Sequence, residues 1–240
     1  MKAVVLAAGK GVRMAPLTDN KPKALVELAG KTLIERVLET FAGAGVKEVL
    51  IVTGYLGEMV EEKLGQEFGG MTLKYVNQAE QSGTANAIGL AKEFAGDSDF
   101  VCTYCDVISK SSIFKELFDA ASVSGENSPE AIVVGREVSD PWRFGVMKVK
   151  EGLLEEIVEK PAAGTQESKL INAGIYWFSS KIFDAIDQTG KSERNEFEIT
   201  DSLNTLAKEN KVQVIEYAGK CFDIGTVEDL EAAEKEIAKS

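Results

Sequence analysis

The sequence predicts an α/β fold with a Rossmann-like, mostly parallel sheet and helices on both of its faces. The alternation of expected elements predicts this class, and the composition predicts a packed core. Over the first 135 residues, short apolar runs of strand length alternate with segments whose apolar residues repeat at helical spacing. The composition, with 44% hydrophobic and 28% charged residues, is that of a globular protein with enough apolar side chains for a core.

The expected elements of the first half alternate along the chain. Apolar runs indicate strands over residues 4–6, 49–52, 73–76, 100–104 and 131–134. Helical spacing of apolar residues indicates helices over residues 33–41, 56–64, 85–94 and 112–122. Gly43 and Gly45 are expected to end the first helix. An alternation of this kind favours parallel strands that are joined by crossover helices.

The pattern changes after Gly135. Shorter strands are expected over residues 145–149, 154–158, 171–178 and 212–217, and helices over residues 180–186, 198–208 and 227–238. No linker or low-complexity tract separates the two patterns. We therefore expect a single domain over residues 1–240, in which a Rossmann-like half, 1–135, is followed by a smaller, lid-like half, 136–240.

Charge and hydropathy exclude several classes of partner. The formal net charge is −12, so no extended basic surface is expected for nucleic acid. No apolar run approaches the roughly 20 residues that a membrane helix needs. The apolar stretch at residues 3–8 is too short for the core of a signal peptide. The sequence thus predicts a cytoplasmic protein that binds neither nucleic acid nor a membrane.

The side chains most used for proton transfer and metal binding are scarce. The chain has no histidine, which removes Ser-His and Cys-His nucleophile pairs. Cys102 and Cys105 have the spacing of redox and zinc sites, but residues three apart on a strand point to opposite faces. Buried thiols are the favoured interpretation. The remaining chemistry is positioning and electrostatics, as in phosphoryl or nucleotidyl transfer.

The N-terminal segment is the strongest single indication of function. The first expected strand runs into the loop Gly9-Lys10-Gly11, and residues 1–26 contain five basic residues and one acidic residue, a net charge of +4. Positive charge combined with free backbone N–H groups favours a polyphosphate ligand. The loop is not a dinucleotide fingerprint, because Met14 occupies the third glycine position, and it lacks the spacing of a P-loop. Pro16 and Pro22 are expected to hold the segment extended.

Several segments, in the same order along the chain, resemble the motifs of the sugar-1-phosphate nucleotidylyltransferases. The string LAAGKGVRM, followed by PKAL, resembles the family's G-x-G-x-R and P-K signature. Residues 76–85 resemble the base-recognition loop of the uridylyltransferases that act on N-acetylglucosamine 1-phosphate. The other matches are YCDV at 104–107, FGV at 144–146, EKP at 159–161, NAGIY at 172–176 and FDIGT at 222–226. The resemblance implies a GT-A-like nucleotidyltransferase fold with a smaller sugar-binding lid region.

The resemblance also implies a role for each matching residue. Arg13 and Lys23 are expected to act on the phosphates as the catalytic cations. Asp106 and Asp223 are expected to bind Mg²⁺. The residues expected to bind the nucleotide are Leu6, Ala8, Gly9, Gly11, Gln78, Gly83, Thr84 and Tyr104. Those expected to bind the sugar phosphate are Gly145, Glu159, Lys160 and Asn172.

The implied reaction is Mg²⁺-dependent transfer of a nucleotidyl group from UTP to a sugar 1-phosphate, either N-acetylglucosamine 1-phosphate or glucose 1-phosphate, with release of pyrophosphate. One alternative is a glucose-1-phosphate thymidylyltransferase that makes dTDP-glucose, since uracil and thymine differ by a methyl group worth about 1 kcal/mol. A more remote alternative is a non-catalytic nucleotide-binding module, because Cys105 stands where the family usually has glycine. The left-handed β-helix of many relatives is missing, so no acetyltransferase activity is expected. Homo-oligomers are common in the family, and the oligomeric state stays open.

Overall fold

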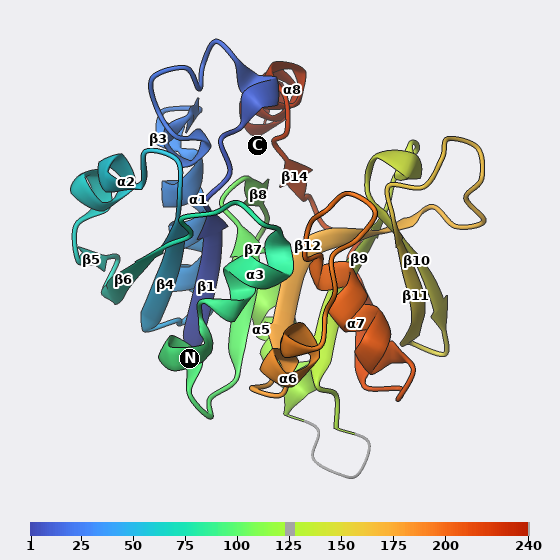
Figure 1. Cartoon of the computed structure of the whole chain (residues 1–240). Helices are drawn as coiled ribbons and strands as arrows, with labels where there is room; N and C mark the ends of the chain where they lie inside the picture. Colours follow the sequence, from blue (N-terminus) through green and yellow to red (C-terminus); the bar gives the residue numbers. More distant parts are fainter. Residues whose placement is uncertain (123–127, 240) are drawn as a thin grey trace. The chain divides into compact units, whose positions relative to one another are not determined.

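The computed structural model describes residues 1–122 and 128–239 (Figure 1). The chain divides into two compact units. Unit 1 comprises Met1–Gln81, Thr103–Phe114 and the chain from Gly219 onward, and unit 2 comprises Ser82–Cys102 and Lys115–Ala218. The chain passes from one unit to the other within the strand β7 and again within the helix α5. The bounds of these two elements are Phe100–Tyr104 for β7 and Ser111–Ala121 for α5. The expected division into halves at residue 135 stays a prediction.

Unit 1 is built on a mainly parallel sheet. Its strands are hydrogen-bonded in the order β5, β6, β4, β1, and the three longer ones lie side by side in Figure 1. Their bounds are β1 Lys2–Ala7, β4 Glu48–Thr53, β5 Glu67–Phe68 and β6 Met71–Asn77. The pairs β1–β4 and β4–β6 are parallel, whereas the short β5 runs antiparallel to β6. Almost every residue of β1 and β4 is buried, which explains their unbroken apolar sequence.

The helices of unit 1 begin and end at residues that favour helix boundaries. A capping box between Thr32 and Glu35 begins α1, and Gly45 ends it in a left-handed conformation with φ 85°. A second capping box, between Thr226 and Asp229, begins α8. The helices of unit 1 are α1 Leu33–Ala44, α2 Gly57–Leu64 and α8 Val227–Ile237. Two short antiparallel ladders complete the unit: β2 Glu27–Leu28 pairs with β3 Lys31–Thr32, and β8 Val107–Ile108 pairs with β14 Phe222–Asp223.

Unit 2 is built on strands that pair mainly antiparallel. They are β9 Ala131–Glu137, β10 Gly145–Lys150, β11 Leu153–Glu159, β12 Leu170–Phe178 and β13 Val212–Glu216. The strand order β10, β11, β13, β9, β12 returns to its start, because β10 also pairs with β12. The pair β13–β9 is parallel. The ladders β10–β11 and β12–β9 are antiparallel, and a two-residue turn directly joins β10 to β11, as antiparallel neighbours allow.

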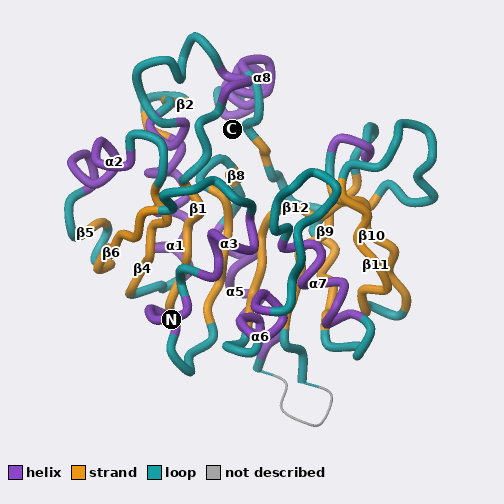
Figure 2. Tube along the Cα trace, in the orientation of Figure 1, coloured by secondary structure: helices purple, strands orange, loops and turns teal. Residues whose placement is uncertain are grey.

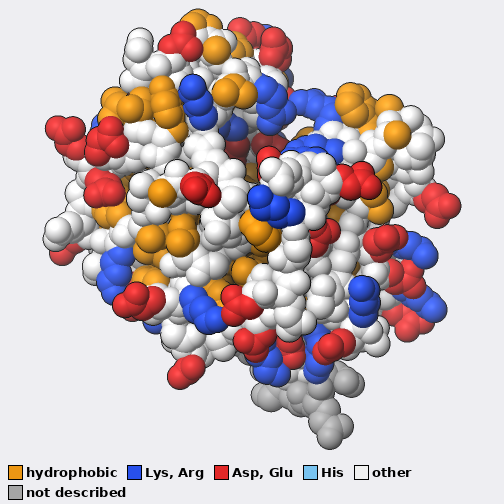
Figure 3. Space-filling model, viewed as in Figure 1, with side chains coloured by type: hydrophobic (Ala, Val, Ile, Leu, Met, Phe, Trp, Pro, Cys, Tyr) orange, Lys and Arg blue, Asp and Glu red, His pale blue; other side chains and the backbone are white. Residues whose placement is uncertain are grey.

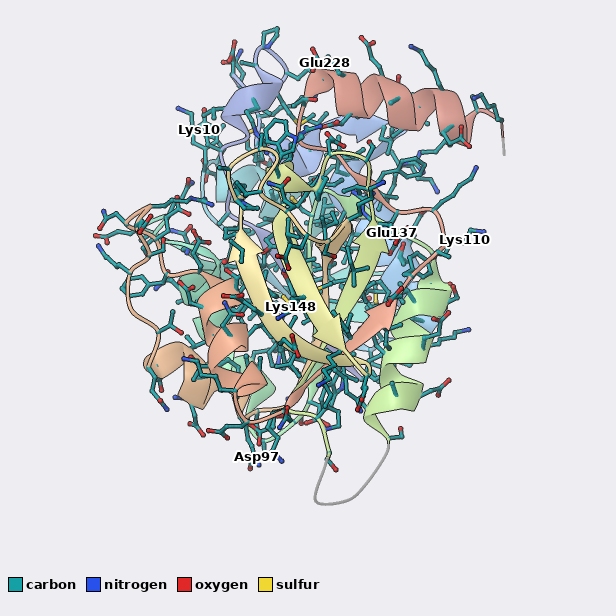
Figure 4. All side chains as sticks on the ribbon, turned by 90° about the vertical axis from the view of Figure 1, so that its right-hand side faces the viewer. Lys10, Asp97, Lys110, Glu137, Lys148 and Glu228 are labelled. Atoms are coloured by element: carbon teal, nitrogen blue, oxygen red, sulfur yellow. The ribbon has the colours of Figure 1, made fainter. Side chains whose placement is uncertain are left out.

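The helices of unit 2 are short (Figure 2). They are α3 Thr84–Gly89, α4 Lys92–Ala95, α6 Ile182–Asp187 and α7 Ile199–Ala207, with a 3₁₀ turn at Pro141–Arg143. Helix α7 is fastened to β11 by the Asn204 side chain, which accepts from the Ile157 N–H over 2.7 Å and donates to the Ile157 carbonyl over 2.8 Å. Figure 4 shows Lys148 on the β10–β11 ribbon, where its Nζ lies 3.0 Å from Glu155 Oε2.

The predicted α/β class is confirmed, and the structure corrects three local expectations. Gly43, which was expected to end the first helix together with Gly45, lies inside α1. The helix expected over residues 85–94 is divided into α3 and α4. Gly89 is a poor helix former, and the Ala91 N–H donates to the Ile88 carbonyl in a tight turn between the two helices. The segment expected to be extended around Pro16 contains a 3₁₀ turn at Val12–Met14, and the Ala15–Pro16 bond is cis. The left-handed conformation of Gly11, directly before this turn, bends the chain away from the extended path.

The two cysteines at 102 and 105 lie in the interior of the protein. Cys102 and Cys105 are buried free thiols, as predicted, and burial raises the pKa of both well above its ordinary value. Among the described residues, no helix combines the length and the apolar character that crossing a membrane requires. On the face drawn in Figure 3, acidic and basic side chains are interspersed.

Candidate active site

The loop that follows β1 is shaped by Gly11. This residue has a left-handed conformation, φ 67°, which glycine adopts readily. A Cβ at this position would lie 2.9 Å from Lys23 Cβ, so the loop backbone and the stem of Lys23 touch. The Thr18 hydroxyl donates to the Gly11 carbonyl over 2.9 Å. A Cβ at Gly9, in contrast, would meet no atom within 4 Å, which leaves the backbone at this position accessible.

Lys23 forms an ion pair with Asp106. Its Nζ donates to Asp106 Oδ2, and the two side chains are only 11% and 17% exposed. Burial lowers the pKa of Lys23, but the neighbouring groups, with Asp106 the strongest of them, together outweigh burial, so the net pKa lies above the ordinary value of 10.5. The ammonium is therefore charged at neutral pH in surroundings of low dielectric constant, where it attracts a phosphate strongly.

Asp223 lies near Asp106 across the ladder of β8 and β14. The ladder pairs Asp223 with Val107, and the Ile224 N–H donates to the Asp106 carbonyl over 3.0 Å. Burial lowers the pKa of Lys23, and the charge of Asp223 joins that of Asp106 in raising it. The described residues contain no group of three or more metal-ligating side chains. Two carboxylates suit Mg²⁺, which completes its coordination with water and phosphate oxygens, so this donor set fits the ion.

Arg13 lies against the start of α8. A Cβ at Gly225 would lie 3.2 Å from Arg13 Nη2 and 3.3 Å from Asp229 Oδ2, so the guanidinium packs on the backbone of Gly225. Asp229 fixes this backbone by accepting from the N–H groups of Gly225 over 3.1 Å and Thr226 over 2.9 Å. The segment at 222–226 thus supplies both the Asp223 carboxylate and the surface on which Arg13 packs.

Unit 1 therefore combines a glycine loop, two cations and two carboxylates. The family model described as nucleotidyl transferase matches residues 2–240. The chain belongs to the nucleotidyl transferase family. This membership confirms the family that the sequence motifs predict.

Relatives of this nucleotidyl transferase include enzymes that act on sugar phosphates. The chain is 33% identical to the UTP–glucose-1-phosphate uridylyltransferase AglF of Haloferax volcanii, over 99% of this chain and 96% of the relative. It is 34% identical to the bifunctional protein GlmU of Methanocaldococcus jannaschii, over 98% of this chain and 54% of the relative. The chain thus spans about half the length of this bifunctional relative.

Solved structures have the same fold as this nucleotidyl transferase. One is described as a glucose-1-phosphate thymidylyltransferase of Bacillus anthracis in complex with sucrose, with a TM-score of 0.85, 30% identity and coverage of 98% of this chain and 94% of that one. Another is a UDP-glucose pyrophosphorylase in complex with UDP-glucose, with a TM-score of 0.88, 26% identity and coverage of 99% and 98%. The predicted nucleotidyltransferase fold is confirmed.

The residues predicted to bind the nucleoside are distributed over both units. In unit 1, Leu6 and Ala8 are buried at the end of β1, and Tyr104 is half-buried at the end of β7. Gln78 is 6% exposed directly after β6, and its N–H donates to the Thr53 carbonyl over 2.7 Å. Their contacts to a nucleoside stay a prediction.

Gly83 and Thr84 belong to unit 2 and have a structural function there. Gly83 has φ 121°, and a Cβ at this position would lie 2.4 Å from the Phe197 carbonyl oxygen. The same carbonyl accepts from the Ala85 N–H over 2.8 Å, and Thr84 Oγ1 accepts from the Ile199 N–H over 2.9 Å. These contacts join the start of α3 to the segment that precedes α7. A role of either residue in nucleotide binding stays a prediction.

Three residues predicted to bind the sugar phosphate lie on neighbouring strands of unit 2. Gly145 on β10 pairs with Glu159 on β11, and the register of β10 with β12 puts Asn172 opposite Gly145. A Cβ at Gly145 would lie 3.0 Å from Glu159 Oε2, so the absence of a side chain makes room for this carboxylate. The Asn172 amide donates to the Tyr176 hydroxyl over 2.8 Å. The structure therefore brings these three positions together.

Lys160, the fourth predicted residue, belongs to a cluster of charges with Glu159, Arg194 and Glu198, which we call the arginine cluster. Glu159 Oε1 lies 3.4 Å from both Lys160 Nζ and Arg194 Nη1, and Arg194 Nη2 lies 3.5 Å from Glu198 Oε1. The Glu198 side chain is 7% exposed, and its Oε1 accepts no hydrogen bond. Burial raises the pKa of Glu198 above the ordinary 4.5, although Arg194 opposes the shift.

The sequence motifs do not predict Arg194 and Glu198. Both lie in the polar segment SERNEFE, which has neither helical nor strand periodicity. The only local signal is a basic residue among acids directly before the apolar start of α7. Thr200 resembles Glu198 in having a buried oxygen, Oγ1, without a hydrogen-bond partner. Its Cγ2 would lie 3.6 Å from a Cβ at Gly145, so it is close to the predicted sugar-phosphate residues. Buried polar atoms without partners are rare in proteins, and a polar ligand supplies such partners.

Proposed function

We propose that this chain transfers a uridylyl group from UTP to a sugar 1-phosphate in a Mg²⁺-dependent reaction that forms a UDP-sugar and releases pyrophosphate. The observation that carries the proposal is the convergence of Lys23, Asp106 and Asp223 beside the glycine loop of unit 1. Cations alone would suffice to bind phosphates, whereas two carboxylates repel them. A divalent cation between the carboxylates and the phosphates removes this repulsion.

The residues of unit 1 fit a reaction that needs no general base. The attacking oxygen of a sugar 1-phosphate is already an anion, so the barrier lies in alignment and charge neutralisation. A chain without histidine can supply both. The N–H groups of Gly9 and Gly11 and the guanidinium of Arg13 hold the β- and γ-phosphates. Lys23, whose ammonium stays charged, neutralises the charge that develops at the α-phosphate.

The metal and the sugar phosphate have separate candidate ligands. Asp106 and Asp223 would hold Mg²⁺, which when bound adds positive charge at the phosphate oxygens. In unit 2, Lys160 and Arg194 are the cations for the sugar phosphate. Carboxylate and amide oxygens of the arginine cluster and of Asn172 accept from sugar hydroxyl groups. Glu198 Oε1, which is ion-paired with Arg194 but accepts no hydrogen bond, supports this role, because a hydroxyl donor offsets the cost of its burial.

Comparison with relatives supports UTP as donor and glucose 1-phosphate as one acceptor. The name of the Haloferax volcanii relative contains both, and one similar structure contains UDP-glucose. N-acetylglucosamine 1-phosphate stays the other acceptor of the proposal. The Bacillus anthracis neighbour favours the alternative donor, dTTP. A single methyl contact of about 1 kcal/mol separates the two donors by roughly fivefold.

The test is pyrophosphate release from four nucleoside triphosphates against four sugar 1-phosphates. We expect turnover with UTP and at least one of the two proposed acceptors, loss of turnover with a chelator, and recovery with Mg²⁺. A Lys23→Met variant should lose turnover, whereas Lys31→Met, which changes an exposed lysine of unit 1, should keep it. No turnover with any pair in the presence of Mg²⁺ would refute the proposal.

A further inference from the structure

Residues 9–21, which we call the triphosphate loop, bind phosphates through backbone N–H groups only if these groups have fixed directions. A loop that had to be ordered on binding would bind more weakly, because each residue that becomes ordered costs conformational entropy. Inside the loop, the 3₁₀ turn at Val12–Met14 and the bond from Thr18 to Gly11 fix the middle. The beginning and the end of the loop depend on contacts from elsewhere in unit 1.

Tyr55 provides such contacts at three points. Its N–H donates to the Ala8 carbonyl over 3.3 Å, directly before the loop, and its hydroxyl donates to the Asp19 carbonyl over 3.2 Å, near the end of the loop. Between them, Lys10 Nζ lies 5.1 Å from the centroid of the Tyr55 ring, within the range of a cation–π interaction. Figure 4 labels Lys10. A single residue thus connects the beginning and the end of the loop.

The turn that carries Tyr55 is fixed against the end of β1. The Gly57 N–H donates to the Gly54 carbonyl over 3.0 Å and closes the turn. A Cβ at Gly54 would lie 2.6 Å from the Ala8 oxygen, so the turn packs on this carbonyl more closely than any residue with a side chain would allow. The Gln81 Nε2 donates to the same oxygen over 2.8 Å. Two donors therefore hold the Ala8 carbonyl.

Holding the Ala8 carbonyl also sets the direction of the next N–H group. In a planar trans peptide, the carbonyl of one residue and the N–H of the next share a plane and point in opposite directions. The bonds from Tyr55 and Gln81 to Ala8 therefore aim the Gly9 N–H away from both donors. The open space around Gly9 leaves this N–H accessible to a ligand.

We infer that Tyr55 is a positioning residue of the triphosphate loop, which aims the Gly9 N–H and the Lys10 ammonium at the phosphates of the nucleotide. The inference rests on the proposed function in its choice of a triphosphate as ligand. Tyr55 itself touches no phosphate. It acts through Ala8 at the beginning of the loop, through Lys10 inside it and through Asp19 near its end.

The test compares Tyr55→Phe and Tyr55→Leu with a matched control, Tyr75→Phe. The Tyr75 hydroxyl also donates to a backbone carbonyl of unit 1, that of Gly65. Affinities for UTP and for inorganic tripolyphosphate are measured by calorimetry, and kinetics give kcat and the KM for each substrate. We expect Tyr55→Phe to weaken tripolyphosphate binding about threefold, for one exposed hydrogen bond, and Tyr55→Leu about 10- to 30-fold, because the contact with Lys10 is lost as well. The KM for the sugar 1-phosphate and the binding of Tyr75→Phe should stay within about twofold of wild type.

Two outcomes would overturn the inference. One is that Tyr55→Leu binds tripolyphosphate as tightly as wild type. This outcome counts against the inference even if the variant has a lower melting temperature. The other is an equal rise of KM for UTP and for the sugar 1-phosphate, which would indicate general damage to the fold. If the wild type turns over no pair of substrates, the proposed function fails. The tripolyphosphate affinities still decide the role of Tyr55 in that case.

Discussion

Replacing Asp106 by asparagine tests the ion pair at the centre of unit 1. The substitution keeps the shape of the side chain but removes the charge opposite Lys23, whose side chain is 11% exposed. Loss of one partner of a buried ion pair costs about 3–5 kcal/mol, because the other charge stays buried alone. Partial exposure and the nearby Asp223 reduce this to roughly 2–3 kcal/mol here. In a chain of this length, the melting temperature should fall by about 4–12 °C.

Adding Lys23→Met to this variant separates stability from activity. The double variant contains neither charge, so the unpaired ammonium that destabilises Asp106→Asn is gone. Its melting temperature should return to within about 3 °C of wild type, since the two substitutions act on one pair and are not additive. Neither the single nor the double variant should turn over substrates, because a candidate metal ligand is missing from both.

The effect of the ion pair depends on pH in a defined direction. Burial lowers the pKa of Lys23, and the neighbouring groups, Asp106 foremost, together outweigh burial, so the folded-state pKa lies above the ordinary 10.5. A base with a raised pKa contributes its full stability below the ordinary value, and this contribution is lost as the pH rises through the folded-state value. The difference in melting temperature between wild type and Asp106→Asn should therefore be largest near pH 7 and be lost as the pH rises through the folded-state pKa of Lys23 in wild type.

Calorimetry on the purified variants is the assay. Glu39→Gln is a matched control, because it breaks an ion pair with Lys31 in which the side chains are 43% and 50% exposed. Exposed pairs contribute little, so this variant should melt within about 2 °C of wild type. The reasoning is refuted if Asp106→Asn also melts within that range, or if the double variant is less stable than Asp106→Asn.

Three further substitutions test individual contacts. Gly225→Ala should displace the Arg13 guanidinium by a few tenths of an ångström. The KM for UTP should rise roughly threefold to tenfold, with little loss of stability. An unchanged KM would contradict the packing of Arg13 on Gly225. Glu198→Gln should raise the KM for the sugar 1-phosphate about tenfold. In wild type, the melting temperature should fall as the pH rises from 4.5 to the raised pKa of Glu198, because burial disfavours the ionised carboxylate. Glu198→Gln should not show this fall. A fall that persists in the variant would have another origin. Gly83→Ala should destabilise the chain by about 3 kcal/mol in denaturant titration, because its Cβ would collide with Phe197. A stable variant with weakened UTP binding would instead favour a direct nucleotide contact.

The elements that the sequence predicts well are those with strong periodicity. The buried strands β1 and β4 are unbroken apolar runs, and α1 has both its capping box and its terminal Gly45 in the printed sequence. The break between α3 and α4 escapes prediction, because apolar spacing continues through the Ala91 turn. Periodicity reports which face of a segment is apolar, and it cannot report a local tightening of the turn.

The candidate site is predictable as a set of residues but not as a set of contacts. Resemblance supplies Lys23 and Asp106, yet their ion pair joins positions 83 residues apart, and no local pattern encodes such a distance. Arg194 and Glu198 lie outside every quoted motif, and their importance follows from burial and from an unused acceptor atom. Gly83 is the opposite of Arg194 and Glu198: it belongs to a quoted motif, but the structure shows a packing role for it against Phe197.

The interleaving of the two units along the chain has a consequence for synthesis on the ribosome. Asp106 belongs to the middle stretch of unit 1, whereas Asp223 and Gly225 belong to its last stretch, which begins at Gly219. A nascent chain that has released only the first 200 or so residues has the glycine loop, Lys23 and Asp106, but it cannot form the ladder of β8 with β14. The pair of carboxylates and the surface for Arg13 therefore form only after the other two stretches of unit 1 have been synthesised. The metal ligands of the proposed reaction therefore come together only after residues 219–226 have left the exit tunnel.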